Sequence, residues 1–205
     1  RNKKGCRVYY DNLVPSLNQG AYKYKQKWQI DLETPIEETE WKAYQKSIFR
    51  AHENSDFRWF QYSLVHRILP TNLLLFKMGY IDNKLCSFCN ASPESEVHLF
   101  YECPKVKHVW KQFSSWIENR TDIKITIDKR KTIFGFVEKR NDVLNLLITI
   151  VKYTLLKSRS SHIPSFENIK KEISKVYDIE KIYSVSSLKF TKFVGFWSEC
   201  HKLFE

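Results

Sequence analysis

Three cysteines and one histidine lie close together in the middle of the 205-residue chain, at spacings that suit a metal ion. Cys86 and Cys89 are separated by two residues, so both thiolates can reach one ion from a single tight turn. His98 follows after eight intervening residues, and Cys103 after four more. Soft thiolates and one imidazole favour zinc over magnesium or calcium. Four protein ligands close the shell, which indicates a structural rather than a catalytic site.

The spacing of His98 and Cys103 constrains the backbone between them. On a regular α-helix, residues five apart are rotated by about 500° and face different sides. Pro104 disfavours helical geometry at the residue before it, so we expect the helix to break at Cys103 and turn this thiol toward the metal. The competing interpretation is three scattered buried thiols and a surface histidine. Cys6 and Cys200 are too distant in the sequence to be counted as ligands.

Helical patterns cover most of the chain, so the expected fold class is mainly α, with one short β or extended segment. The predicted helices span residues 37–51, 55–69, 71–78, 94–102, 105–118, 141–158, 165–185 and 186–203, and the extended segment spans 123–127. Ser55 is the expected N-cap of the second helix, and Pro70 ends it. Helical spacing of Trp59 and Tyr62 favours the core over a stacking platform, and His66 is interpreted as a hydrogen-bonded packing residue.

Three parts are expected along the chain: a basic arm or linker at 1–27, a helical segment at 28–120 and a C-terminal helical segment at 121–205 that packs on it. The Cys-Cys-His-Cys cluster at 86–103 is expected to form a zinc knuckle embedded in the second part. The net charge is +11, and residues 1–27 hold seven basic residues, one acidic residue and four tyrosines. This arm either follows a phosphate backbone with its rings stacked on bases, or links to a preceding domain.

Membrane and secreted classes are not expected. The most apolar stretch, Val143 to Leu156, is too short and too polar to span a bilayer, and no signal-peptide pattern follows the basic start. The chain begins at Arg1 and its single methionine is Met78, so we expect either a piece of a longer polypeptide or a processed product. The hydrophobic content of 42% excludes a disordered basic tail.

Several segments around the cysteines together resemble the C-terminal, cysteine-rich region of reverse transcriptases from LINE-type (non-LTR) retrotransposons. The likeness covers roughly residues 28–171. The segments that carry it are Phe60 to Pro70 (FQYSLVHRILP), Leu75 to Gly79, Cys86-x2-Cys89, Glu96-x-His98-Leu99-Phe100-x2-Cys103, Trp110, Lys152-Tyr153, Arg159 and Pro164-Ser165-Phe166.

This resemblance implies a function. In such elements one polypeptide usually carries a nuclease, a reverse transcriptase and this cysteine-rich segment; it nicks target DNA and copies its own RNA from the nick. The segment is expected to bind template RNA, target DNA or both, in a ribonucleoprotein of the nucleus and cytoplasm. The expected partners are nucleic acid, the remaining reverse transcriptase polypeptide and possible host factors, with no membrane. The alternative is a zinc-stapled structural module that braces the polymerase or recruits a host protein.

The resemblance assigns the ligand roles to Cys86, Cys89, His98 and Cys103. By itself this chain is not expected to be an enzyme. Tyr9-Tyr10-Asp11-Asn12 offers one carboxylate where two-metal nucleotide transfer needs at least a pair, and no nuclease constellation is visible.

Basic side chains near these motifs are the candidate contacts to nucleic acid. They are Arg58, Arg67, Lys105, Lys107, Lys111, Lys129, Arg130, Lys131 and Arg159. Lys129 to Lys131 are expected either as a loop that contacts the nucleic-acid backbone or as a short patch of the nuclear-import type. Arg159, with three serines beside it, is favoured as a phosphate contact, whereas Lys152 is expected to extend its ammonium group from the helix edge into water.

Overall fold

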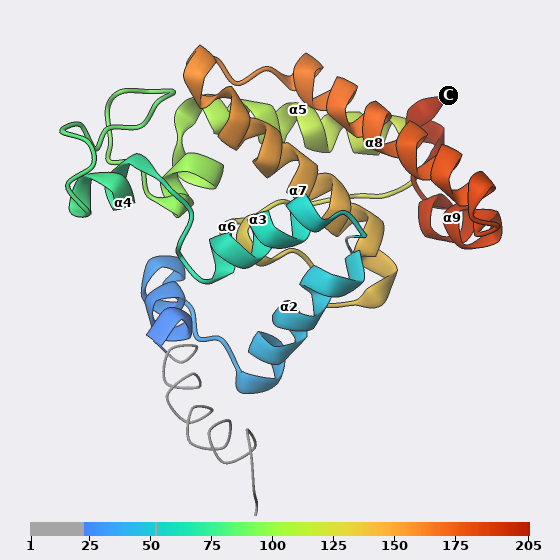
Figure 1. The fold of residues 1–205 in the computed structure, drawn as a ribbon, viewed down its shortest axis with the longest axis horizontal. Helices are drawn as coiled ribbons and strands as arrows, with labels where there is room; N and C mark the ends of the chain where they lie inside the picture. The colour runs from blue at the N-terminus through green and yellow to red at the C-terminus, as the bar shows by residue number, and fades with distance from the viewer. Residues whose placement is uncertain (1–22, 52) are drawn as a thin grey trace, which may run out of the picture.

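Helices build the part of the chain that the computed structural model describes, residues 23–51 and 53–205 (Figure 1). A first helix covers 23–32. The others are α2 (Glu38–Ala51), α3 (Ser55–Val65), α4 (Asn72–Lys77), η1 (His98–Glu102), α5 (Pro104–Arg120), α6 (Lys129–Phe134), η2 (Lys139–Asn141), α7 (Asp142–Lys157), η3 (Ser158–Ser161), α8 (Phe166–Ser186), α9 (Phe190–Trp197) and η4 (His201–Phe204). Within these ranges β-type pairing is limited to an isolated bridge between Leu85 and Pro93. The mainly α class is confirmed.

Helix α7 forms the centre of the core. Its residues are buried on nearly every side, as expected for a helix that is apolar almost all round. It packs against α2 and α3 from the first half of the chain and against α8 and α9 from the second half (Figure 1). The segment after residue 121 therefore shares one core with the segment before it.

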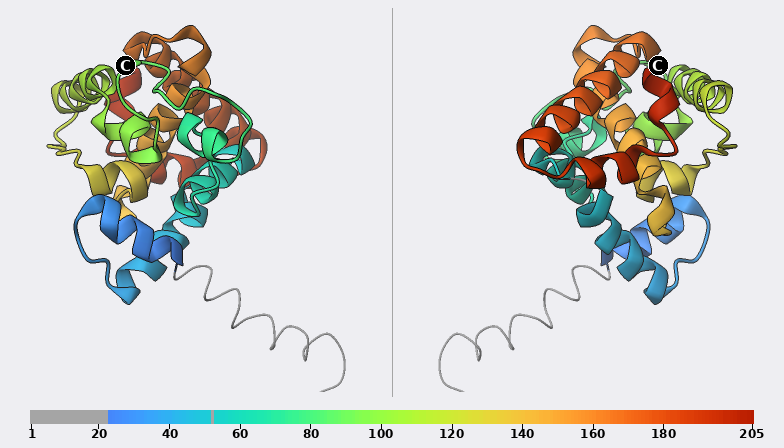
Figure 2. Two further views of the ribbon diagram at one scale, coloured as in Figure 1. Left: turned by 90° about the vertical axis from the view of Figure 1, so that its left-hand side faces the viewer. Right: turned by 90° about the vertical axis from the view of Figure 1, so that its right-hand side faces the viewer.

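The loop between α4 and η1 lies at one end of the molecule, and α9 lies at the other (Figures 1 and 2). None of the helices in the described ranges has the length and apolar character needed to cross a bilayer. The cysteine-rich loop therefore sits at a distance from α9, and α5 and α7 connect the two ends.

Helix α3 begins and ends differently from the prediction. Its N-cap is Asn54, whose side chain accepts hydrogen bonds from the backbone N–H groups of Asp56 and Phe57, one residue before the expected Ser55. The helix ends at Val65 rather than at 69, because Arg67 adopts a left-handed conformation with φ 57°. The C-terminus is a Schellman motif: the N–H of Ile68 bonds to Ser63 O, and that of Arg67 to Leu64 O.

Three other predictions are corrected, and a fourth is narrowed to one of its two alternatives. The arm was expected to reach residue 27, but helix 23–32 begins within it; residues 1–22 lie outside the described residues. Residues 123–127, expected as a short strand or extended stretch, lie outside the helices and pair with no strand in the described part of the chain, and Ile125 is buried against the core. Lys129 to Lys131 open α6 instead of forming a loop, because Asp128 caps them by accepting from Lys131 N at 2.7 Å. The helix expected at 186–203 is divided into α9 and η4.

Candidate metal centre

The four predicted ligands lie together in the structure. The ligand atoms of Cys86, Cys89, His98 and Cys103 are all within 4.8 Å of one another. Cys86 Sγ lies 3.9 Å from Cys103 Sγ, and Cys89 Sγ lies 3.3 Å from His98 Nε2. Standard zinc bond lengths in a tetrahedron give about 3.8 Å between two sulfurs and about 3.6 Å between sulfur and nitrogen. The residues therefore fit one tetrahedral zinc ion.

A π-helical turn places His98 and Cys103 on the same side. In η1 the N–H of Cys103 donates to His98 O at 2.9 Å, a bond that spans five residues. Five residues thus complete about one turn here, and the mismatch expected of a regular α-helix disappears. Cys103 itself is no longer helical: its backbone has φ −57° and ψ 125°, and Pro104 follows it directly. The predicted break at Cys103 is confirmed, while the π turn that precedes it was missed.

The first two cysteines lie on a tight loop, residues 84–94, which we call the zinc loop. Cys86 N donates to Ser92 O at 2.8 Å, and Glu94 N donates to Lys84 O at 2.8 Å, so the two arms of the loop pair. Between them the N–H of Asn90 bonds to Cys86 O at 2.9 Å, and Asn90 adopts φ 52°. This closed turn brings the Cys86 and Cys89 thiols to the same point.

The pKa values of the two buried thiols, Cys86 and Cys103, are shifted in opposite directions. The hydrogen bond from the Cys86 thiol lowers the pKa of Cys103 to about 7, against the effect of burial, and the backbone N–H groups of Val106 and Lys105 at the start of α5 lower it further. The same thiol–thiol bond and burial raise the pKa of Cys86. Without metal, Cys103 is therefore the first of this pair to become a thiolate, which is the form that binds zinc.

Glu94 ties the zinc loop to the rest of the molecule. Its carboxylate is fully buried. One oxygen accepts from Asn72 N at 3.0 Å and from the Arg159 guanidinium at 2.8 Å. The other accepts from both the N–H and the hydroxyl of Ser87, each at 2.8 Å. Arg159 also donates to Pro70 O at 3.0 Å, so α4, the zinc loop and η3 meet at this carboxylate.

Arg67 has a similar internal role beneath η1. Its guanidinium pairs with Asp31 and, at 3.3 Å, with Glu96. It also lies 4.3 Å above the ring of Trp28, which is fully buried and donates to Val65 O. These contacts hold the left-handed turn after α3 and join it to helix 23–32.

The three basic residues of α6 also have partners within the fold. Lys129 pairs with Glu102 at 2.9 Å, and Arg130 pairs with Glu40 at 2.5 Å. Lys131 donates to Thr126 O at 2.9 Å. Together with Arg67 and Arg159, these candidate contacts to nucleic acid are engaged within the fold. Lys129, Arg130, Arg67 and Arg159 pair with acids distant in the sequence, and Lys131 has neighbouring partners.

The candidates on α5 are placed differently. Lys105, Lys107 and Lys111, which we call the α5 lysines, are exposed and follow the ligand Cys103 directly. Across the described residues, none of the three forms an ion pair with a carboxylate. Arg58, the remaining candidate, is partly buried on α3. The α5 lysines are therefore the predicted contacts that face solvent beside the metal centre.

Two expectations about side chains were wrong. Trp59 and Tyr62 were expected in the core, but their exposed fractions are 64% and 37%. Lys152 was expected at the helix edge, but it is fully buried and donates to Gln61 Oε1 at 2.7 Å and Ile133 O at 3.0 Å. Those two oxygens accept the amine inside the core, where burial holds the pKa of Lys152 well below its usual range.

Cys200 is not part of the metal cluster. It is buried near the C-terminus, where burial raises the pKa of its thiol to about 12. Cys6 lies outside the described residues. His66 has the expected packing role, since its ring stacks on Tyr62 and its Nδ1 lies 2.9 Å from Tyr62 O.

Comparison with known proteins identifies the region that carries the cluster. Residues 22–110 match a family described as zinc-binding in reverse transcriptase. The search of curated proteins and the search of solved structures gave no match. The matched range contains all four clustered ligands. The family match and the cluster together support a reverse-transcriptase-associated zinc-binding region, rather than a catalytic polymerase domain, at residues 22–110.

Proposed function

We propose that this chain is a nucleic-acid-binding accessory region of a reverse transcriptase from a LINE-type element, which holds template RNA or target DNA during target-primed reverse transcription. The observation that carries the proposal is that the three α5 lysines are exposed, form no ion pair with a carboxylate among the described residues, and lie on the helix that begins directly after Cys103. A phosphate backbone that binds such side chains releases its counterions, which favours binding. The α5 lysines also break no ion pair with a carboxylate of the described residues when they bind.

The metal gives these lysines a fixed position. Cys103 is both a ligand and the residue before α5, so zinc fixes the first turn of the helix relative to the zinc loop. Lys105 and Lys107 lie two and four residues after this ligand. Zinc therefore stabilises the fold and orients the α5 lysines without taking part in chemistry.

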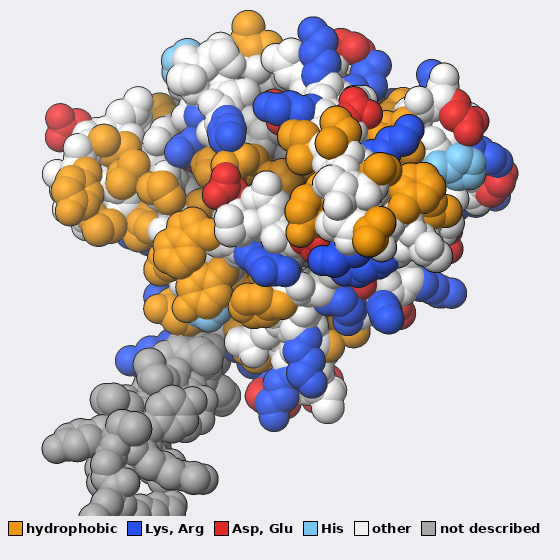
Figure 3. Space-filling model, turned by 45° about the vertical axis from the view of Figure 1, so that its right-hand side comes forward, with side chains coloured by type: hydrophobic (Ala, Val, Ile, Leu, Met, Phe, Trp, Pro, Cys, Tyr) orange, Lys and Arg blue, Asp and Glu red, His pale blue; other side chains and the backbone are white. Residues whose placement is uncertain are grey.

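A second candidate function is docking onto another part of the reverse transcriptase polypeptide. Its support is an aliphatic surface at the end of α8, formed by the exposed Ile179, Ile182, Val185 and Leu188. Figure 3 shows hydrophobic side chains reaching the surface among Lys and Arg on this side of the molecule. Because the aliphatic surface and the α5 lysines are made by different helices, the two functions can be tested separately.

The test is binding of the zinc-loaded chain to single-stranded RNA and duplex DNA over a series of salt concentrations. We compare the wild type with a Lys105→Gln, Lys107→Gln, Lys111→Gln triple variant. The slope of log K against log salt is negative, and each lost phosphate contact on a single strand reduces its magnitude by about 0.7. The triple variant should therefore reduce the magnitude of the slope by about 2.

A control variant removes the same charge elsewhere. Lys46, Lys124 and Lys181 are also exposed, and their replacement by glutamine leaves α5 intact. If both triple variants lose the same affinity and slope, the α5 lysines have no special role. If the wild type binds neither nucleic acid, the proposal fails and docking through the aliphatic surface becomes the better account.

A further inference from the structure

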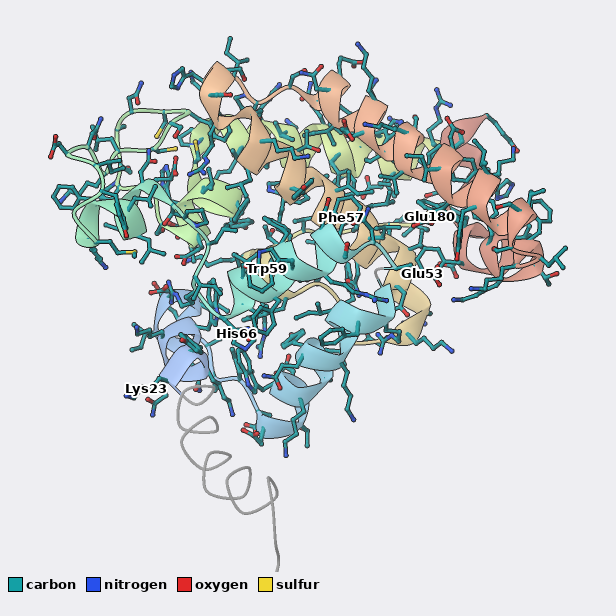
Figure 4. The ribbon with its side chains drawn as sticks, in the orientation of Figure 1. Lys23, Glu53, Phe57, Trp59, His66 and Glu180 are labelled. Carbon is teal, nitrogen blue, oxygen red and sulfur yellow. The ribbon has the colours of Figure 1, made fainter. Side chains whose placement is uncertain are left out.

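Three aromatic rings form a stacked column along the outer face of α3. Trp59 lies 5.7 Å from Tyr62 with an angle of 20° between the rings, and Tyr62 lies 3.9 Å from His66 with an angle of 25°. The positions are three and four residues apart, so they share one face of the helix. Figure 4 labels Trp59 and His66 at the two ends of this ring column.

The ring column is separate from the core. Phe57, Phe60 and Leu64 supply the buried face of α3, and Figure 4 labels Phe57 near the start of the helix. Trp59 stacks on Tyr62 with one face and keeps 64% of its surface exposed. The Trp59 ring is therefore the last ring of the column, and its second face is available for stacking with a further planar group.

The other end of the ring column is basic. The ring of Tyr24 meets His66 edge-on at 5.6 Å, which joins helix 23–32 to the column. Lys23 and Lys27 are exposed on that helix, one turn apart, and Figure 4 labels Lys23 below His66. By sequence, residues 1–22 directly before them contain four basic residues and one acidic residue. Planar rings beside positive charge complement a ligand that is itself planar and anionic.

We propose that the ring column is a stacking platform for unpaired bases of a single-stranded nucleic acid, with Lys23 and Lys27 facing its phosphates. The inference rests on the proposed function and narrows its ligand to single strands. Bases stack on Trp and Tyr whatever their sequence, whereas bases inside a duplex have no free face. A protein partner fits the aliphatic surface better, because Ile179, Ile182, Val185 and Leu188 present aliphatic side chains, whereas the ring column presents stacked planar rings.

The test uses three probes with the zinc-loaded chain: a uridine dodecamer, an abasic dodecamer with the same sugar–phosphate backbone, and an RNA duplex. The variants are Trp59→Ala, Trp59→Phe and, as a control for loss of an exposed ring elsewhere, Tyr183→Ala. Tyr183 is 54% exposed on α8. Trp59→Ala should weaken binding of the uridine dodecamer by roughly 5- to 150-fold. Trp59→Phe should restore most of that loss.

Two further results are specific to stacking. Trp59→Ala should leave binding of the abasic dodecamer and of the duplex unchanged, because neither offers an unpaired base. It should also leave the salt slope for the uridine dodecamer unchanged, whereas loss of the α5 lysines lowers that slope.

The two proposals fail in different ways. If the α5 triple variant weakens binding while Trp59→Ala equals the wild type, the stacking platform is wrong and the proposed function stands. Equal losses on uridine and abasic dodecamers also overturn the platform. If the wild type binds no probe, the proposed function fails and this inference fails with it.

Discussion

Replacing Glu94 with glutamine removes a negative charge from the buried junction beside the zinc loop while it keeps the side chain's size. Glutamine retains one oxygen for Asn72 N and Arg159, but its NH₂ group faces the N–H of Ser87, which loses its acceptor. A buried unsatisfied donor costs about 1–3 kcal/mol, and loss of a buried counter-charge costs about 3–5 kcal/mol. Because the Arg159 side chain is 21% exposed, water compensates part of the second loss. We expect Glu94→Gln to destabilise the zinc-loaded chain by about 2–4 kcal/mol.

The assay is urea unfolding of wild type and variant in saturating zinc, followed by competition for zinc with a chelator. Zinc affinity should fall by about tenfold, because Ser87 lies between two ligands and Glu94 holds its backbone. Glu167→Gln, in an exposed pair with Lys170, is the matched control and should cost less than about 0.5 kcal/mol. A change below about 1 kcal/mol at Glu94, with unaltered zinc affinity, would refute the assigned role of this carboxylate.

Three other predictions concern the fold. Gly135→Ala should destabilise by about 2–3 kcal/mol in urea unfolding, because Gly135 has φ 77° and an added Cβ would lie 2.3 Å from Asn145 Oδ1; near-wild-type stability would contradict this. Asn54→Ala should cost about 1 kcal/mol and Ser55→Ala much less, and the reverse order would restore Ser55 as the cap. Burial lowers the pKa of Lys152, so the unfolded chain binds a proton that the folded chain lacks, and wild-type stability should rise with pH by up to about 1.4 kcal/mol per unit below about pH 10.4. Lys152→Met should lack this rise, so its stability relative to wild type should fall as the pH approaches about 10 from below, and a pH-independent difference from wild type would show that Lys152 stays charged.

Local sequence signals predicted the metal centre because its chemistry is local. The spacing of Cys86 and Cys89 requires only a tight turn, and Pro104 restricts the residue directly before it. The π turn at His98 was not predictable in the same way. No residue type specifies it, and it forms because both His98 and Cys103 must face one point while the following helix packs on the core.

Contacts between distant segments explain why the burial of some side chains was predicted wrongly. Lys152 is stabilised in the core by Gln61 and Ile133 O, and no local pattern indicates that pairing. Trp59 has the same helical spacing as a core residue, but the neighbouring stripe of Phe57 and Phe60 supplies the buried face instead. The start of α6 did have a local signal, since Asp128 is a favourable N-cap residue.

The claim on which the whole account depends is that Cys86, Cys89, His98 and Cys103 bind one zinc ion. The most direct measurement is the zinc content of the purified chain together with zinc X-ray absorption, for the wild type, Cys103→Ser and Cys200→Ser. We expect one zinc per chain with three sulfur neighbours and one nitrogen neighbour in the wild type and in Cys200→Ser, and loss of stoichiometric zinc in Cys103→Ser. Absence of bound zinc from the wild type would contradict the account. So would a Cys103→Ser variant that binds zinc with the same neighbours as the wild type.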